Sequence, residues 1–177
     1  MSFSRQAFVR AHSIFDPIKN LRMKNILMAA MFMITSVPLV FSQESNRAKD
    51  FNLESGGLAI QGYDPVSYFT TGKAVKGAKE NAVSYNGALY YFSSVENKEA
   101  FKKSPAKYEP AYGGWCAYAM GAKGEKVSVD PKTFKIVDSH LNLFYNKLFN
   151  NTLEDWNKDE GNLKKKAGMN WAKIAGN

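Results

Sequence analysis

Residues 82–92 read AVSY-NG-ALYYF, and this stretch decides the fold. Two β-prone runs flank Asn86-Gly87, a dipeptide that tolerates positive φ and suits the tight type I′ turn of a hairpin. A second candidate hairpin occupies residues 134–145, FKIV-DS-HLNLFY, with Asp138-Ser139 as its two-residue loop. The sequence therefore predicts two antiparallel hairpins.

Short helical segments are expected after each hairpin. Ser93 stands three residues before Glu96, a capping box that predicts a helix, and Pro105 ends it. Residues 151–173 have an acidic start and apolar side chains at helical spacing, and Gly161 is expected to divide them into two helices. We therefore expect an α+β fold, in which small antiparallel hairpins pack with short helices and a C-terminal helical segment.

The first 42 residues have the layout of an export signal. Residues 26–41 form an uncharged apolar run, ILMAAMFMITSVPLVF, with basic residues before it and a polar segment after it. A proline interrupts the run, and it is shorter than the roughly 20 residues that a membrane-spanning helix needs. Cleavage before Gln43 is therefore favoured over a retained anchor, and translation from Met23 would give a conventional short basic start. We expect a periplasmic or secreted protein with no stable membrane span after signal removal.

The remaining chain is expected to form a flexible tether at 43–57 and one domain at 58–177. The net charge of the 177 residues is +8, and half of it lies in the signal region. The lysines lie on expected loops and helix faces and do not alternate with the aromatic residues as they would in a nucleic-acid groove. The sequence thus indicates no nucleic-acid partner, whereas an envelope protein partner stays open.

Four motifs occur in a distinctive order: GYDPVSYF at 62–69, SYNGALYYFSSVENKEAFKKSPAKY at 84–108, YGGWCAYAM at 112–120 and DPKTFKIVDSHLNLFYN at 130–146. This combination resembles the exported branch of the YHS-domain family. The wider family consists of small α+β domains related to metal-binding modules of the treble-clef, TRASH-like sort. The resemblance therefore implies a YHS-like domain over 58–177 and a role in metal handling.

This chain departs from the metal-binding relatives at their ligand positions. In those relatives the pattern runs DPVCG, then YYFCS with a second cysteine four residues later. The resemblance places Ser67, Ser93 and Asn97 at those three cysteine positions. The histidine of the family pattern is missing as well. Since a soft or borderline metal needs thiolate or imidazole donors, we do not expect a treble-clef zinc site.

Cys116 is the only cysteine in the sequence, which excludes an internal disulfide and a multi-cysteine zinc site. If residues 115–120 are helical, Cys116 and Met120 share one helix face, and a thiolate with a thioether is a donor set that selects Cu(I). His140, the only histidine after the signal, completes this candidate metal site. The alternative is structural: Cys116 and Met120 as buried apolar side chains and His140 as an exposed loop residue.

Tyr63, Asp64 and Tyr68 form a second candidate site. Asp64 could accept a hydrogen bond from a polar ligand or bind a hard cation between two aromatic walls, with Trp115 completing the surface. The structural alternative is an Asp-Pro turn beside two tyrosines that fill the core.

The sequence carries no recognised catalytic motif, because G-x-S-x-G, a phosphate loop and C-x-x-C are all missing. A thiol–imidazole pair of Cys116 with His140 is the remaining enzymatic alternative. We therefore predict a non-enzymatic, exported binding module that handles copper or a related soft metal through Cys116. The alternative is a metal-free module that binds a small ligand or a protein partner through the same surface.

Overall fold

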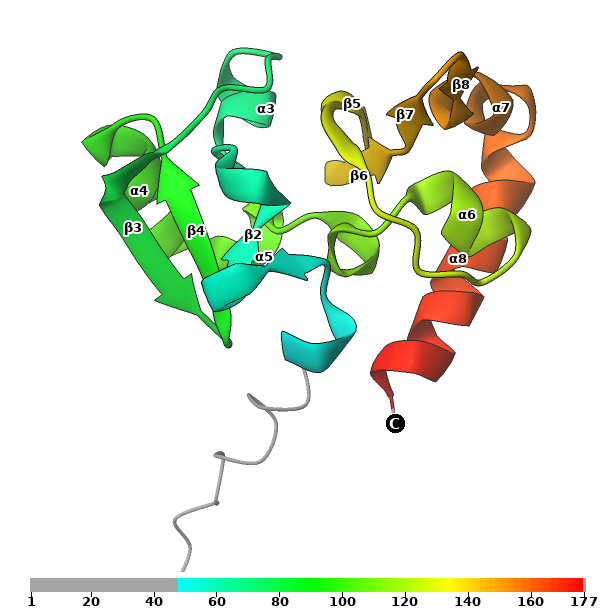
Figure 1. The fold of residues 1–177 in the computed structure, drawn as a ribbon, viewed down its shortest axis with the longest axis horizontal. Coiled ribbons are helices and arrows are strands. Elements are labelled where there is room, and N and C mark those ends of the chain that lie inside the picture. Colours follow the sequence, from blue (N-terminus) through cyan, green and yellow to red (C-terminus); the bar gives the residue numbers. More distant parts are fainter. Residues whose placement is uncertain (1–47, 177) are drawn as a thin grey trace, which may run out of the picture. The chain divides into compact units, whose positions relative to one another are not determined.

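A computed structural model describes residues 48–176 of the chain (Figure 1). The signal expected at 1–42 and the first residues of the expected tether lie outside this range. The described residues belong to one compact unit. None of their helices has both the length and the apolar character needed to cross a membrane.

The fold is α+β, as the sequence predicts. The strands are β1 (Leu53–Glu54), β2 (Leu58–Ala59), β3 (Ala78–Tyr85), β4 (Ala88–Phe92), β5 (Asp130–Val137), β6 (His140–Phe144), β7 (Asn146–Lys147) and β8 (Asn150–Asn151). The α-helices are α3 (Ser67–Thr70), α4 (Val95–Lys103), α5 (Pro105–Tyr108), α6 (Ala117–Ala122), α7 (Thr152–Lys158) and α8 (Glu160–Ala175). Short 3-10 turns lie at Ser55–Gly57 (η1), Ile60–Gly62 (η2) and Ala111–Gly114 (η3).

The first predicted hairpin forms the edge and second strand of a four-stranded sheet with the order β1-β2-β4-β3. Strands β3 and β4 are antiparallel and joined at Asn86 (φ 49°) and Gly87 (φ 80°), the positive φ pair that a type I′ turn requires. Strand β2 pairs with β4 in parallel, and β1 pairs with β2 in antiparallel fashion. The turn at residues 86–87 therefore brings β3 and β4 together as an antiparallel pair.

The second predicted hairpin, β5–β6, turns at Asp138 and Ser139, which both have positive φ. Two parallel bridges attach a distant segment to β6, Pro110 to Leu141 and Cys116 to Leu143. The chain entering α6 therefore runs beside β6, and this contact positions Cys116.

The helix boundaries differ from the expected ones in two places. The N-cap of α4 is Ser94, whose hydroxyl accepts from the Asn97 N–H, because the Ser93 side chain bonds to Asp64 instead. The break between α7 and α8 lies at Asp159, which has a non-helical φ of −148°. Gly161 therefore lies inside the first turn of α8.

The segment expected as a tether joins the fold from Asp50 onward. The Asp50 carbonyl accepts from the Trp115 indole N–H at 2.6 Å, and its carboxylate pairs with Lys126 at 2.9 Å. Asn52 donates from its backbone to Gly113, and Leu53 lies in β1. These long-range contacts explain why a polar stretch without apolar periodicity is held in place.

Helices α6 and α8 pack closely at Gly121. A Cβ added to Gly121 would lie 2.6 Å from the Leu163 carbonyl oxygen, inside van der Waals contact. The small residue thus lets α6 approach the backbone of α8, beside a small core of Ala117, Phe144, Trp156 and Leu163.

Replacing Gly121 by alanine should lower the free energy of unfolding by about 1–3 kcal/mol, because the added methyl group overpacks the α6–α8 contact. Gly168→Ala in α8 is the matched control, since its added Cβ meets nothing within 4 Å. That control should raise stability by roughly 0.5–1 kcal/mol through better helix propensity. Urea denaturation followed by circular dichroism measures both, and equal effects at the two positions would contradict the packing argument.

Candidate functional site

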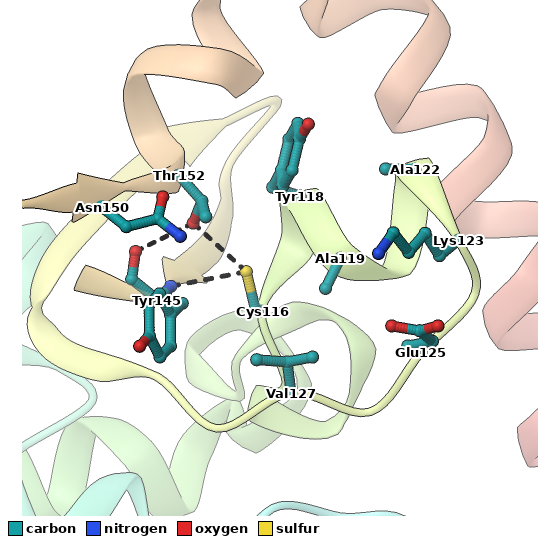
Figure 2. A pocket seen from close by; sticks show the side chains of 10 residues that line it. All are labelled: Cys116, Tyr118, Ala119, Ala122, Lys123, Glu125, Val127, Tyr145, Asn150 and Thr152. Carbon is teal, nitrogen blue, oxygen red and sulfur yellow. Dashed lines mark hydrogen bonds between the residues drawn. The ribbon is translucent and has the colours of Figure 1, made fainter. Parts of the chain in front are cut away.

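A pocket of about 260 Å³ opens beside Cys116 (Figure 2). Its wall comes from α6, the loop that follows α6, the end of β6, strand β8 and the start of α7. The lining residues are Cys116, Tyr118, Ala119, Ala122, Lys123, Glu125, Val127, Tyr145, Asn150 and Thr152. Residues 116–127 therefore meet residues 145–152 around one sulfur atom.

Cys116 lies in extended backbone as the N-cap of α6, with ψ 116°. Its N–H donates to the Val127 carbonyl at 2.9 Å, and its bridge to Leu143 holds it against β6. The helix expected over 115–120 therefore begins only at Ala117, after the cysteine. Because Cys116 is outside the helix, the argument that it shares a helix face with Met120 does not apply.

The Cys116 sulfur has two polar neighbours. It accepts the Tyr145 backbone N–H at 3.4 Å and lies 3.4 Å from the Thr152 hydroxyl oxygen. Thr152 in turn donates its hydroxyl proton to the Tyr145 carbonyl at 2.9 Å. Since that hydroxyl has one proton, Cys116 is the donor in the contact with Thr152, and the thiol is fully buried.

The structure does not bring Met120 and His140 to this pocket. Met120 is fully buried in α6 and is not part of the pocket wall. His140 is exposed, and its Nδ1 donates to the Asp138 carbonyl at 2.7 Å. It precedes Leu143, the residue beside Cys116, by three positions of β6, which is about 10 Å along a strand. The three residues of the candidate copper site therefore do not converge.

Tyr63, Tyr68 and Trp115 also lie outside the pocket wall. Tyr68 is buried and donates its hydroxyl to the Pro131 carbonyl at 2.9 Å, and burial raises the pKa of this phenol far above its ordinary value. The Lys76 ammonium lies 4.3 Å from the centre of the Tyr63 ring, which is itself buried. The indole N–H of Trp115 bonds to Asp50. Each of these side chains connects parts of the fold.

Asp64 is the centre of a separate hydrogen-bonded group. Its carboxylate is fully buried, and Oδ1 accepts the backbone N–H of Val66 at 2.8 Å and of Ser67 at 3.4 Å. Oδ2 accepts the Ser93 N–H at 2.9 Å, the Ser93 hydroxyl at 2.6 Å and the Asn97 side-chain amide at 2.7 Å. We call Asp64, Ser67, Ser93 and Asn97 the Asp64 cluster. The three positions that the resemblance assigns to metal ligands thus surround one carboxylate.

Neither place provides an evident metal centre. Within residues 48–176, no group of three or more His, Cys, Asp or Glu side chains is close enough to hold a metal ion. The Asp64 cluster has neither thiolate nor imidazole, and the pocket has a single soft donor. The donor sets present therefore do not fit the soft or borderline metals that the resemblance implies.

Sequence reasoning found Cys116 but missed the other polar groups of the pocket. Lys123 and Glu125 come from a short loop, and Asn150 comes from a two-residue strand, so no periodic pattern marks them. Among the described residues neither Lys123 nor Glu125 forms an ion pair. Figure 2 shows these two side chains on one side of the sulfur, with Tyr145, Asn150 and Thr152 on the other.

A family comparison agrees with the resemblance seen in the motifs. No curated protein and no solved structure matches the chain. The model of the YHS domain matches residues 66–112, which include Ser67, Ser93 and Asn97 but not Cys116. This family is associated with metal binding. The match thus supports the resemblance to the YHS-domain family over residues 66–112, and the pocket is formed by residues beyond the matched segment.

Proposed function

We propose that this protein is an exported binding module that holds a small polar molecule in the pocket beside Cys116. The observation that carries the proposal is the pocket itself, in which polar side chains of residues 116–127 and 145–152 converge beside apolar ones. Such a combination is typical of ligand sites, where apolar walls supply affinity and a few polar groups fix orientation.

The pocket restricts the size and charge of its ligand. Its volume of about 260 Å³ is below the roughly 300–1,000 Å³ of pockets for drug-sized ligands, so the ligand is smaller than those. Lys123 and Glu125 offer one positive and one negative charge without ion-pair partners among the described residues. A small zwitterion such as a free amino acid matches this pair of charges.

Export is part of the proposal and is supported by the sequence layout of residues 1–42. A periplasmic or extracellular location would expose the pocket to nutrients and metabolites outside the cytoplasm. An envelope partner that receives the ligand would be consistent with this role.

Copper binding through Cys116 is a second candidate function. One observation favours it, because Cys116 is the only soft donor in the pocket wall, although its side chain is fully buried. The positions of Met120 and His140 make it the weaker candidate, since a Cu(I) ion held by one thiol lacks the further soft donors that give tight binding.

Cys116 lines the pocket but is fully buried, so small thiol reagents should reach it in the folded protein through local fluctuations that open the pocket wall. Methyl methanethiosulfonate should modify it much faster than the protein unfolds, and Ala122→Phe should slow this reaction by roughly tenfold or more by filling the pocket mouth. Ala172→Phe on the exposed face of α8 is the matched control and should leave the rate unchanged. Mass spectrometry follows the modification, and a wild-type rate equal to the unfolding rate would show that the pocket is closed.

A panel of free amino acids should contain members that protect Cys116 from this reagent. Lys123→Met and Glu125→Gln should each weaken the protection by roughly tenfold, because each removes one charge that would pair with the zwitterion. Protection that is unchanged in both variants would contradict the assigned ligand class.

Copper titration separates the two candidate functions. Wild-type protein and Cys116→Ser should compete equally weakly with a chromogenic Cu(I) chelator, because Met120 and His140 do not join the thiol. One equivalent of tightly bound Cu(I) that is lost in Cys116→Ser would instead support the copper function.

A further inference from the structure

We infer that the Asp64 cluster replaces a metal centre in this YHS-like domain, so that a buried carboxylate joins the elements that a metal would otherwise join. The inference concerns residues 64–97 and does not depend on the ligand of the Cys116 pocket. It follows from where the carboxylate lies, from what it bonds to and from which segments its partners belong to.

The carboxylate joins two segments that are distant in the sequence. Val66 and Ser67 belong to the turn that enters α3, Ser93 follows β4, and Asn97 lies in the first turn of α4. Its partners Ser93 and Asn97 are 29 and 33 residues away in the sequence. A single buried group thus crosslinks the α3 turn to the β4–α4 connection, which is the geometric role of a structural metal.

The carboxylate has little capacity left for a cation. Its two oxygens accept five hydrogen bonds, and all five donors point their hydrogens at the place where a cation would have to bind. Among the ion pairs of residues 48–176, none includes Asp64, so these donors are what compensates its charge. A metal at this site would have to displace them.

Ser67 completes the cluster on the other side. Its hydroxyl oxygen lies 2.7 Å from the Asp64 carbonyl and 3.0 Å from the Lys73 carbonyl, and it accepts the Val75 N–H at 3.3 Å. This side chain therefore ties the loop after α3 to the same point. The Ser93 and Asn97 side chains donate to the carboxylate, whereas Ser67 reaches it through its backbone N–H and uses its hydroxyl for backbone groups. Hydroxyl and amide groups suit such hydrogen bonding and are poor ligands for zinc or copper.

The first experiment measures metal content and thermal stability of the purified full chain. Wild-type protein from zinc- and copper-supplemented culture should contain well below one equivalent of metal, and excess EDTA should leave its melting temperature unchanged. A stoichiometric metal whose removal lowers the melting temperature, and which Asp64→Asn abolishes, would overturn the inference.

The second experiment tests the role of the carboxylate. Asp64→Asn keeps the shape but turns an acceptor into a donor that faces Ser93 and Asn97, so the melting temperature should fall by roughly 10 °C or more. Should this variant fail to fold, Asn97→Ala and Ser93→Ala remove single donors near the surface and should each lower the melting temperature by several degrees. Asn162→Ala, which removes an exposed side-chain hydrogen bond to Asp159, is the control and should change it little.

The third experiment restores a metal centre. The triple variant Ser67→Cys, Ser93→Cys, Asn97→Cys should be less stable than wild type without metal and should regain stability on addition of Zn²⁺. With Co²⁺ it should show the visible absorption of tetrahedral thiolate coordination, which wild type should lack. A triple variant that binds neither ion would show that the three positions do not form one centre and would overturn the replacement.

Discussion

The fully buried Asp64 carboxylate is the constraint on which the N-terminal half of the domain depends. Leaving such a charge uncompensated in the interior would cost several kcal/mol, so the fold must keep its donors in place. Those donors lie on the α3 turn, the end of β4 and the first turn of α4. Because Asn97 also donates its backbone N–H to Ser94, the start of α4 is fixed by the same residues that satisfy the carboxylate. The position of three elements therefore follows from one buried group.

This fixed half supports the half that contains the pocket. Tyr68, at the end of the same turn, donates to Pro131 in β5, and Gln61 donates to the Val129 carbonyl just before it. Strand β6 then holds the chain before α6 through the bridges at Pro110 and Cys116. The position of the Cys116 sulfur thus depends in part on these contacts between the Asp64 turn and strands β5 and β6. Asp64 itself is not in the pocket wall.

Local features of the fold could be predicted from the sequence, and long-range features could not. The turn at residues 86–87 could be predicted because Asn and Gly adopt positive φ at little cost, and Asp138-Ser139 turns the second hairpin in the same way. Both hairpins, and with them the α+β class, could therefore be predicted from short segments of sequence. The attachment of Asp50 to the fold could not be predicted, because it is held by Trp115, 65 residues away. The same holds for Thr152, which meets Cys116 across 36 residues. The helix expected to start at Trp115 fails for a related reason, since bonds to Val127 and Leu143 keep Cys116 extended.

Residues 66–112 match the YHS-domain model, yet their side chains do not fit the metal chemistry associated with that family, and the reason is physical. The segment that matches the YHS-domain model includes positions 67, 93 and 97, and the fold places all three around the Asp64 carboxylate. Their spacing does not determine which atoms occupy the point that they surround. With hydroxyl and amide groups in place of thiols, the point suits an acceptor of hydrogen bonds, and Asp64 supplies one. The sulfur of Cys116 lies outside the matched segment and is buried in the core. It stands in a pocket whose polar groups come from loops that the family pattern does not include.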